Sequence, residues 1–304
     1  MKKAFFYLIL SCLFFLSCSS APKRAMLVTD NSQVAYSQLE DANNSIVSGK
    51  YSRAYNLLAS AYSLALSVDN TDLLCKVTLS GIVFKILCPD ISEIIPAAER
   101  QTSVNEDVFL LKSKDEILAE SKKLANRSSN PAFFSKLCSI YETRIFLENE
   151  LAASDTNSIS SDSCRSYLSV LESVRPLLKK EPYYHAYLYR TEGDVCMAAG
   201  MYDAAQKNFA EAARIHTNDR YLVEIGLDWY CLARAYSLGG KKSDAISAIQ
   251  SALKYDKDAE NTSGIASDYI AYSKILLKDN PTDEEKKLSE ELALWGEKIL
   301  NARN

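Results

Sequence analysis

One spacing of glycine, tyrosine and alanine occurs twice in this chain, in residues 49–61 and again in residues 200–212. In both stretches the Gly is followed two residues later by Tyr, and the Tyr three residues later by Ala. Four residues after that Ala comes a bulky apolar residue, and three residues after this residue comes a second Ala. Steps of three and four place side chains on one face of a helix. Glycine readily adopts the left-handed conformation that ends a preceding helix. The spacing therefore predicts pairs of helices joined by tight turns.

The residues before Gly200 support a helix on the other side of that turn. Tyr189, Gly193 and Cys196 again recur at steps of three and four. The small residues Gly193 and Ala205 are expected to let the two helices approach closely, with Phe209 reaching across to the next unit. Scarce turn residues, 9 Gly and 7 Pro in 304 residues, also favour helices over strands.

This pattern resembles the tetratricopeptide repeat, a helix-turn-helix unit of 34 residues. Two departures from its consensus are Glu192, where Leu is usual, and Thr217, where Pro is common. The resemblance implies an all-α fold, an α-α superhelix: a solenoid of helix-turn-helix repeats with about twelve helices. It covers roughly a third of the chain, with the clearest repeats at 35–68, 186–219 and 226–259.

The rest of the chain is expected to form helices with weaker repeat character. Asn130-Pro131 is a good helix start, and Thr282 with Glu285 matches a capping box. The most loop-like stretches are 155–163 and 89–105, which are either connectors or binding loops. The expected helices lie at 72–87, 104–125, 131–153, 163–179, 262–278 and 282–301.

The first residues predict export and a lipid anchor. Lys2 and Lys3 precede an apolar run, residues 4–16, that suits a signal-peptide core and is short for a membrane span. The following Ser17-Cys18 resembles a bacterial lipobox, although Phe15 replaces the usual Leu. The resemblance implies a signal peptide over 1–17, lipidation of Cys18 including palmitate, a tether over 18–31 and a repeat domain over 32–304. The alternative is an ordinary cleaved signal. We expect a lipoprotein on the cell membrane or outer membrane, facing the periplasm or exterior.

Six cysteines lie in the body of the chain, and two interpretations of them stay open. An even number in an exported protein is compatible with disulfides. No two of them form a CxxC pair, however, and nearly all lie in apolar helical stretches, which favours buried thiols. These residues are Cys75, Cys88, Cys138, Cys164, Cys196 and Cys231.

The sequence lacks the motifs that are typical of most enzyme classes. Two His residues leave little room for a histidine base, and no Walker, GxSxG, HExxH or GxGxxG motif is present. Gly240-Lys241 lacks the upstream glycine of a phosphate loop, since Ala235 stands there. We therefore expect no enzymatic activity, no cofactor and no metal. The net charge of −4, without a basic stripe, argues against nucleic acid.

The resemblance also implies where a partner would bind. In tetratricopeptide domains the concave surface is lined by fixed positions of each first helix. The combination of aromatic side chains and Arg suits the binding of a peptide or helix. Here the corresponding residues are Tyr187, Arg190, Asp194, Met197, Leu227, Tyr230 and Arg234.

Two functions follow from these features, and they predict different interiors. The first is a lipid-anchored scaffold that binds another envelope or periplasmic protein or peptide, in broad plan like repeat lipoproteins that help to assemble outer-membrane barrels or pili. The second is a ligand-handling accessory lipoprotein of a TRAP-type solute transporter, passing a small hydrophobic molecule. A solid superhelix with an open polar groove favours the first, and an apolar cavity lined by the middle helices favours the second.

Overall fold

The computed structural model describes residues 30–91, 94, 109–156 and 158–303, and within these ranges it contains helices and no strands. This confirms the all-α superhelical class and the expected number of about twelve helices. The α-helices are α2 (Asp30–Val47), α3 (Tyr51–Ser67), α4 (Thr71–Leu87), α6 (Lys114–Arg127), α7 (Pro131–Ala153), α8 (Ser161–Val174), α9 (Pro182–Ala198), α10 (Tyr202–Asp219), α11 (Leu222–Leu238), α12 (Lys242–Asp258), α13 (Thr262–Leu276) and α14 (Asp283–Arg303), with short 3-10 helices η2 (Phe109–Leu111) and η3 (Arg175–Leu177).

The three predicted repeats are antiparallel hairpins, α2–α3, α9–α10 and α11–α12, whose turns contain glycines with left-handed backbone. Their φ angles are 65° at Gly49, 70° at Gly200 and 74° at Gly240. At Gly200 and Gly240 a Cβ atom would meet nothing within 4 Å, so conformation rather than space makes glycine suitable there. The repeated Gly thus ends the first helix of each hairpin.

Close packing of α9 on α10 depends on a second kind of glycine. A Cβ atom at Gly193 would overlap the ring of Phe209, which lies directly against the α9 backbone. The ring is 1% exposed and also packs in a cluster with Leu232 and Ala233 of α11. Phe209 therefore joins its own hairpin to the next one, as the spacing predicted.

Two expected helix boundaries differ from those observed. The described part of the expected helix 104–125 contains only η2 before α6, which begins at Lys114 because Ser113 and Glu116 form a capping box. The expected helix 163–179 stops at Val174 and continues as η3. Pro176, with no N–H to donate, lies in that 3-10 segment.

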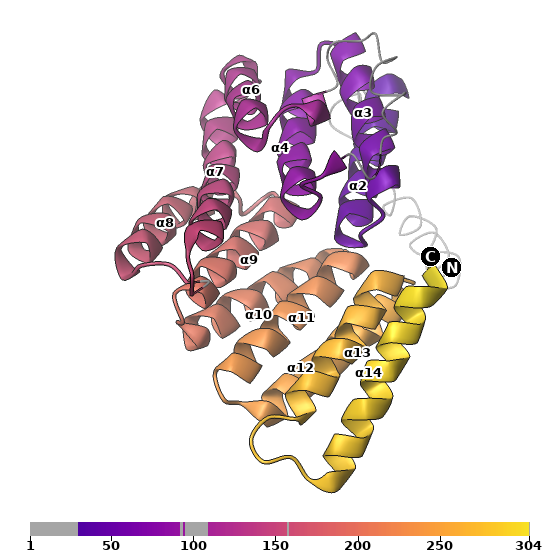
Figure 1. The fold of residues 1–304 in the computed structure, drawn as a ribbon. Coiled ribbons are helices and arrows are strands. Elements are labelled where there is room, and N and C mark those ends of the chain that lie inside the picture. Colours follow the sequence, from indigo (N-terminus) through magenta and orange to yellow (C-terminus); the bar gives the residue numbers. More distant parts are fainter. Residues whose placement is uncertain (1–29, 92–93, 95–108, 157, 304) are drawn as a thin grey trace, which may run out of the picture.

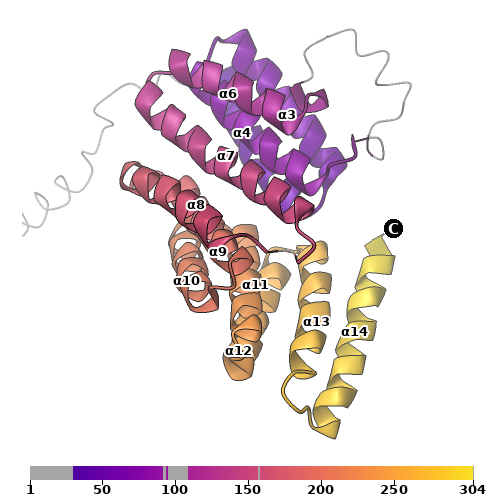
Figure 2. The same cartoon turned by 60° about the vertical axis from the view of Figure 1, so that its left-hand side comes forward.

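The helices form two stacks with a change of direction between them. Helices α2–α7 make one stack and α8–α14 the other, and the break falls at the loop-like stretch after α7 (Figures 1 and 2). The array does not stay open, because α2 packs against α11. The end of α14 also approaches α2, since Leu300 and Val47 line one cavity. Both ends of the described chain therefore meet around a common interior.

The leader, Cys18 and most of the tether lie outside the described residues. Within the described ranges, no helix is long and apolar enough to cross a membrane. The six body cysteines form no disulfide with one another, and all but Cys231 are buried.

Some helices begin with a side-chain cap and others do not, so the contribution of a cap to stability can be tested with a matched pair of variants. The Asn70 side chain accepts a 3.0 Å hydrogen bond from the Leu73 N–H at the start of α4, whereas Lys50 at the start of α3 makes no side-chain cap. We expect Asn70→Ala to lower the free energy of unfolding by about 1 kcal/mol. Lys50→Ala should change it by under about 0.5 kcal/mol. Urea denaturation of both variants checks this, and equal losses would contradict it.

Candidate functional site

A partly open cavity of about 670 Å³ lies between the two stacks. Its wall comes from first helices of the hairpins, α2, α9, α11 and α13, and from α4, α7 and the end of α14. Aliphatic and tyrosine side chains dominate the wall. The main aliphatic and tyrosine members are Ile46, Val47, Val83, Ile86, Leu87, Tyr141, Tyr183, Tyr187, Leu227, Tyr230 and Leu300.

Six of the seven sequence-predicted groove residues line this cavity together: Tyr187, Arg190, Asp194, Leu227, Tyr230 and Arg234. Met197 does not line it, because its side chain packs into the hydrophobic cluster formed by α9–α13. The surface that these six residues share is the wall of a partly open cavity, beside which α2 packs against α11.

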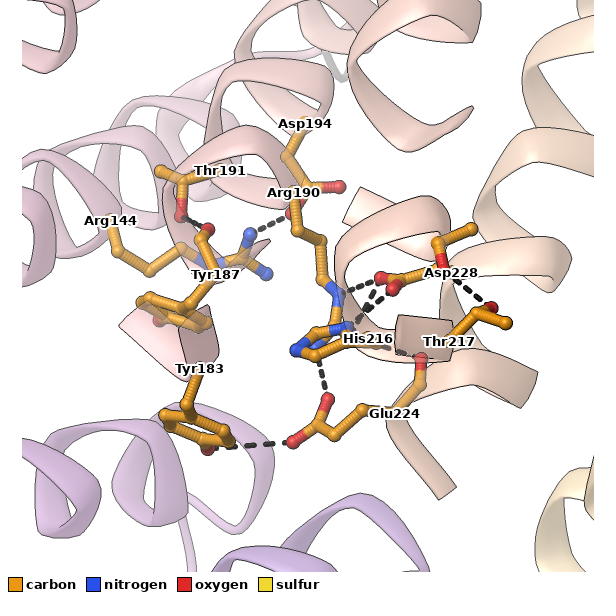
Figure 3. Close-up of polar contacts among 11 residues, drawn as sticks. Arg144, Tyr183, Tyr187, Arg190, Thr191, Asp194, His216, Thr217, Glu224 and Asp228 are labelled. Atoms are coloured by element: carbon orange, nitrogen blue, oxygen red, sulfur yellow. Dashed lines mark hydrogen bonds and ion pairs between the residues drawn. The ribbon is translucent and has the colours of Figure 1, made fainter. Parts of the chain in front are cut away.

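The Arg190 side chain is buried in a charged network rather than presented to a partner. Its Nε donates to Asp228 Oδ1 at 2.7 Å and its Nη1 donates to Glu224 Oε2 at 2.5 Å (Figure 3). Asp228 Oδ2 lies 2.6 Å from His216 Nδ1, and the Tyr183 hydroxyl donates to Glu224 at 3.4 Å. Burial alone would lower the pKa of Arg190, but the Asp228 and Glu224 carboxylates raise it well above its usual value. This network fastens α9, α10 and α11 together.

A second ion pair neutralises the other carboxylate of the wall. Arg144 of α7 binds Asp194 of α9 (Figure 3). Arg144 also lies 3.1 Å from Glu148. Beside it Tyr141 stacks on Tyr187, with ring centroids 5.1 Å apart. Burial raises the pKa of Tyr187 to about 12, so its hydroxyl is a neutral hydrogen-bonding group. These contacts join the first stack to the second across the cavity.

Arg234 differs from the other two arginines of the wall. It is an exposed residue, and no described residue forms an ion pair or hydrogen bond with it. It lines both the main cavity and a neighbouring one of about 360 Å³ between α11 and α13. A third cavity, of about 400 Å³, adjoins the main one at Asn43 and Tyr183. The main cavity thus has neighbouring cavities, and Arg234 is the arginine of its wall that lacks an ion-pair partner among the described residues.

Sequence reasoning missed the partners that come from other elements. Glu224 and Asp228 lie four residues apart within a largely apolar stretch, 222–238, and this was the available signal for a buried charged cluster. No periodicity in one helix could identify Arg144 or Tyr141, because they reach the site from the opposite stack.

The described residues thus belong to the class of all-α helical-repeat folds, with a mainly apolar cavity between two stacks of helices. No protein-family model matches the chain, and no curated protein matches it as a relative.

Proposed function

We propose that this protein binds a small amphipathic organic anion inside the cavity. The observation that carries the proposal is the mainly apolar, partly open cavity between the two stacks, whose volume of about 670 Å³ falls in the range of small-molecule sites, roughly 300–1,000 Å³. An apolar body fits the aliphatic and tyrosine wall.

The charge of the wall suggests which end group the ligand carries. Asp194 and Glu224 are neutralised by Arg144 and Arg190, while Arg234 has no ion-pair partner among the described residues. A guanidinium binds carboxylate and phosphate groups through paired hydrogen bonds. The ligand is therefore expected to place an acidic group at Arg234 and its apolar part toward Leu227 and Tyr187.

We propose further that this binding takes place in the bacterial cell envelope. The lipobox around Cys18 supports a lipid anchor there. A lipid-anchored cavity of this kind suits a ligand-handling accessory lipoprotein of a TRAP-type transporter, which passes its ligand to or from the soluble transport components. The two adjoining cavities support passage of the ligand through the interior.

Native mass spectrometry of the full chain, purified without denaturation, tests the proposal. We expect a bound species of a few hundred daltons that chromatography of an organic extract identifies as an organic acid. Arg234→Ala should reduce its occupancy at least tenfold, because loss of a charge-assisted hydrogen bond costs about 1.5–3 kcal/mol. Arg165→Ala, on the exposed side of α8, is the matched control and should retain full occupancy.

Substitutions that fill the cavity supply an independent test of ligand binding. Ser267 lines the main cavity, so Ser267→Trp should exclude the ligand, while Ser247→Trp on the outside of α12 should not. A preparation that contains no small molecule and binds none from a panel of amphipathic acids would contradict the proposal.

One observation favours the scaffold as a second candidate function. The last helix, α14, leaves large apolar side chains in solvent: Leu294 is 54% exposed, Trp295 53% and Leu288 39%. Exposed apolar groups that gather on one element mark interaction surfaces. Crosslinking in cell envelopes, with Trp295→Ser as the variant, would show whether a protein partner depends on this helix.

A further inference from the structure

The outer face of α14, the last helix of the second stack, carries a compact apolar patch. Leu294 and Trp295 are each more than half exposed, and Leu288 lies about two turns before Trp295. The opposite face of α14, which includes the buried Ser289 and Gly296, packs against α13 (Figure 1). The outer face of a terminal repeat is ordinarily polar, because no further repeat covers it. Apolar side chains in this position indicate a surface that another molecule covers.

Two charged side chains flank the patch at equal distances along the helix. Glu291 stands three residues before Leu294, and Lys298 stands three residues after Trp295. Both are exposed, and their helical spacing places them on the same face as the patch. Lys298 Nζ lies 5.9 Å from the centre of the Trp295 ring, and within the described ranges neither charge has an ion-pair partner. The patch is therefore bordered by a carboxylate on one side and an ammonium on the other.

This order of residues is complementary to itself when two copies of the helix run antiparallel. Around a two-fold axis that passes between Leu294 and Trp295, Leu294 of each copy faces Trp295 of the other. By the same symmetry Glu291 of each copy faces Lys298 of the other, so that the charge pair forms twice. A parallel pair would instead place equal charges opposite each other, which is repulsive. The charges of α14 thus favour a second copy, in the antiparallel direction.

We propose that the outer face of α14 binds the same face of α14 in a second copy of this chain, forming a two-fold symmetric dimer. The proposal names the occupant of the exposed surface that favours the scaffold function. It is independent of ligand binding, because Leu294, Trp295 and the two flanking charges do not line the main cavity.

The size of this face sets the expected strength of the dimer. At about 1.5 Å per residue, the 21 residues of α14 span about 32 Å. A helix face of this length and about 10 Å width covers on the order of 300 Å², less than half of the roughly 800 Å² per partner in a standard interface. We therefore expect a dimer that dissociates in the micromolar range rather than a permanent one.

Sedimentation velocity of the full chain across the micromolar range tests for this dimer. We expect the wild type to shift from monomer to dimer as its concentration rises. Trp295→Ser should weaken the association at least about tenfold, since a Trp at the centre of an interface contributes much of its binding energy. Leu66→Ser on α3, where the Leu is as exposed as Trp295, is the matched control and should associate like the wild type.

Reversal of the flanking charges distinguishes a second copy from any other partner. Glu291→Lys alone and Lys298→Glu alone should each weaken the dimer about tenfold, because each dimer contains the charge pair twice. An equimolar mixture of these two variants should associate again, since every Lys in one copy then faces a Glu in the other. The double variant Glu291→Lys, Lys298→Glu should also associate like the wild type. Far-UV circular dichroism should be the same for all of them, because the substituted side chains are exposed.

Four results would overturn the proposal. The first is a wild type that sediments as a monomer at every concentration. The second is association that persists in Trp295→Ser, which would place the contact elsewhere. The third is a mixture of the two charge variants that stays monomeric. The fourth is a monomer in which Trp295 is needed for crosslinking to a different envelope protein, which would assign α14 to that protein. Ligand occupancy of the main cavity is measured separately and can fail or succeed independently of these results.

Discussion

Replacement of Arg190 by methionine is expected to lower the free energy of unfolding by about 3–5 kcal/mol. The substitution keeps most of the side-chain volume but leaves the Glu224 and Asp228 carboxylates buried without their cation. Removal of one member of a buried ion pair has that order of cost, because the remaining charge is desolvated and uncompensated. Urea denaturation followed by far-UV circular dichroism measures the change.

Two comparisons separate this effect from a simple loss of charge. Arg165→Met, at an exposed pair on α8, should change the free energy of unfolding by under about 1 kcal/mol. The triple variant Arg190→Met, Glu224→Gln, Asp228→Asn should be more stable than the single variant, because it removes the unpaired charges. A loss below about 1 kcal/mol in Arg190→Met would contradict the buried network.

Phe209→Ala should lower the free energy of unfolding by a similar amount, about 3–5 kcal/mol, for a different reason. The ring is 1% exposed and fills the space between the Gly193 backbone of α9 and the apolar face of α11. Its removal leaves a cavity between two hairpins that helices of fixed spacing cannot fully close. Differential scanning calorimetry should show a lower Tm and a smaller unfolding enthalpy.

The matched control for this cavity is Phe146→Ala on α7, where the side chain is 48% exposed. We expect a loss of less than about 1 kcal/mol there. A second check is Gly193→Ala, which should destabilise the wild type by about 1–3 kcal/mol through overlap with the ring. Combined with Phe209→Ala, the same substitution should cost less, since the space is then free. Strict additivity would argue against direct packing.

Much of the fold could be predicted because the information is local. The turn glycines at 49, 200 and 240 and the alanines and bulky apolar residues that follow them specify hairpins within a span of about 34 residues. The start of α6 was harder to predict, since it depends on the capping box of Ser113 and lies next to residues of weak periodicity. The end of α8 likewise depends on one local residue, Pro176.

The site was predicted only in part, because its chemistry is not local. The inward positions of α9 and α11 follow from helical spacing, so six residues were found together. Helical spacing specifies which way a side chain faces but not what it meets. The partners of Arg190 and the stacking of Tyr141 on Tyr187 depend on how hairpins and stacks lie against each other. That Arg234 has no ion-pair partner among the described residues can be seen only when the partners of the neighbouring charged residues are known.

Because α2 packs against α11, the cavity between the stacks can form only after both helices have been synthesised. A repeat array ordinarily gains stability one neighbour at a time, so a partial chain resembles a shorter array. In this protein the wall of the interior joins residues 43–47 to residues 224–234, which leave the ribosome far apart in time. A chain interrupted before residue 222 would have its first hairpins and no chamber. The cavity in which we propose that a ligand binds therefore forms only in the nearly finished polypeptide.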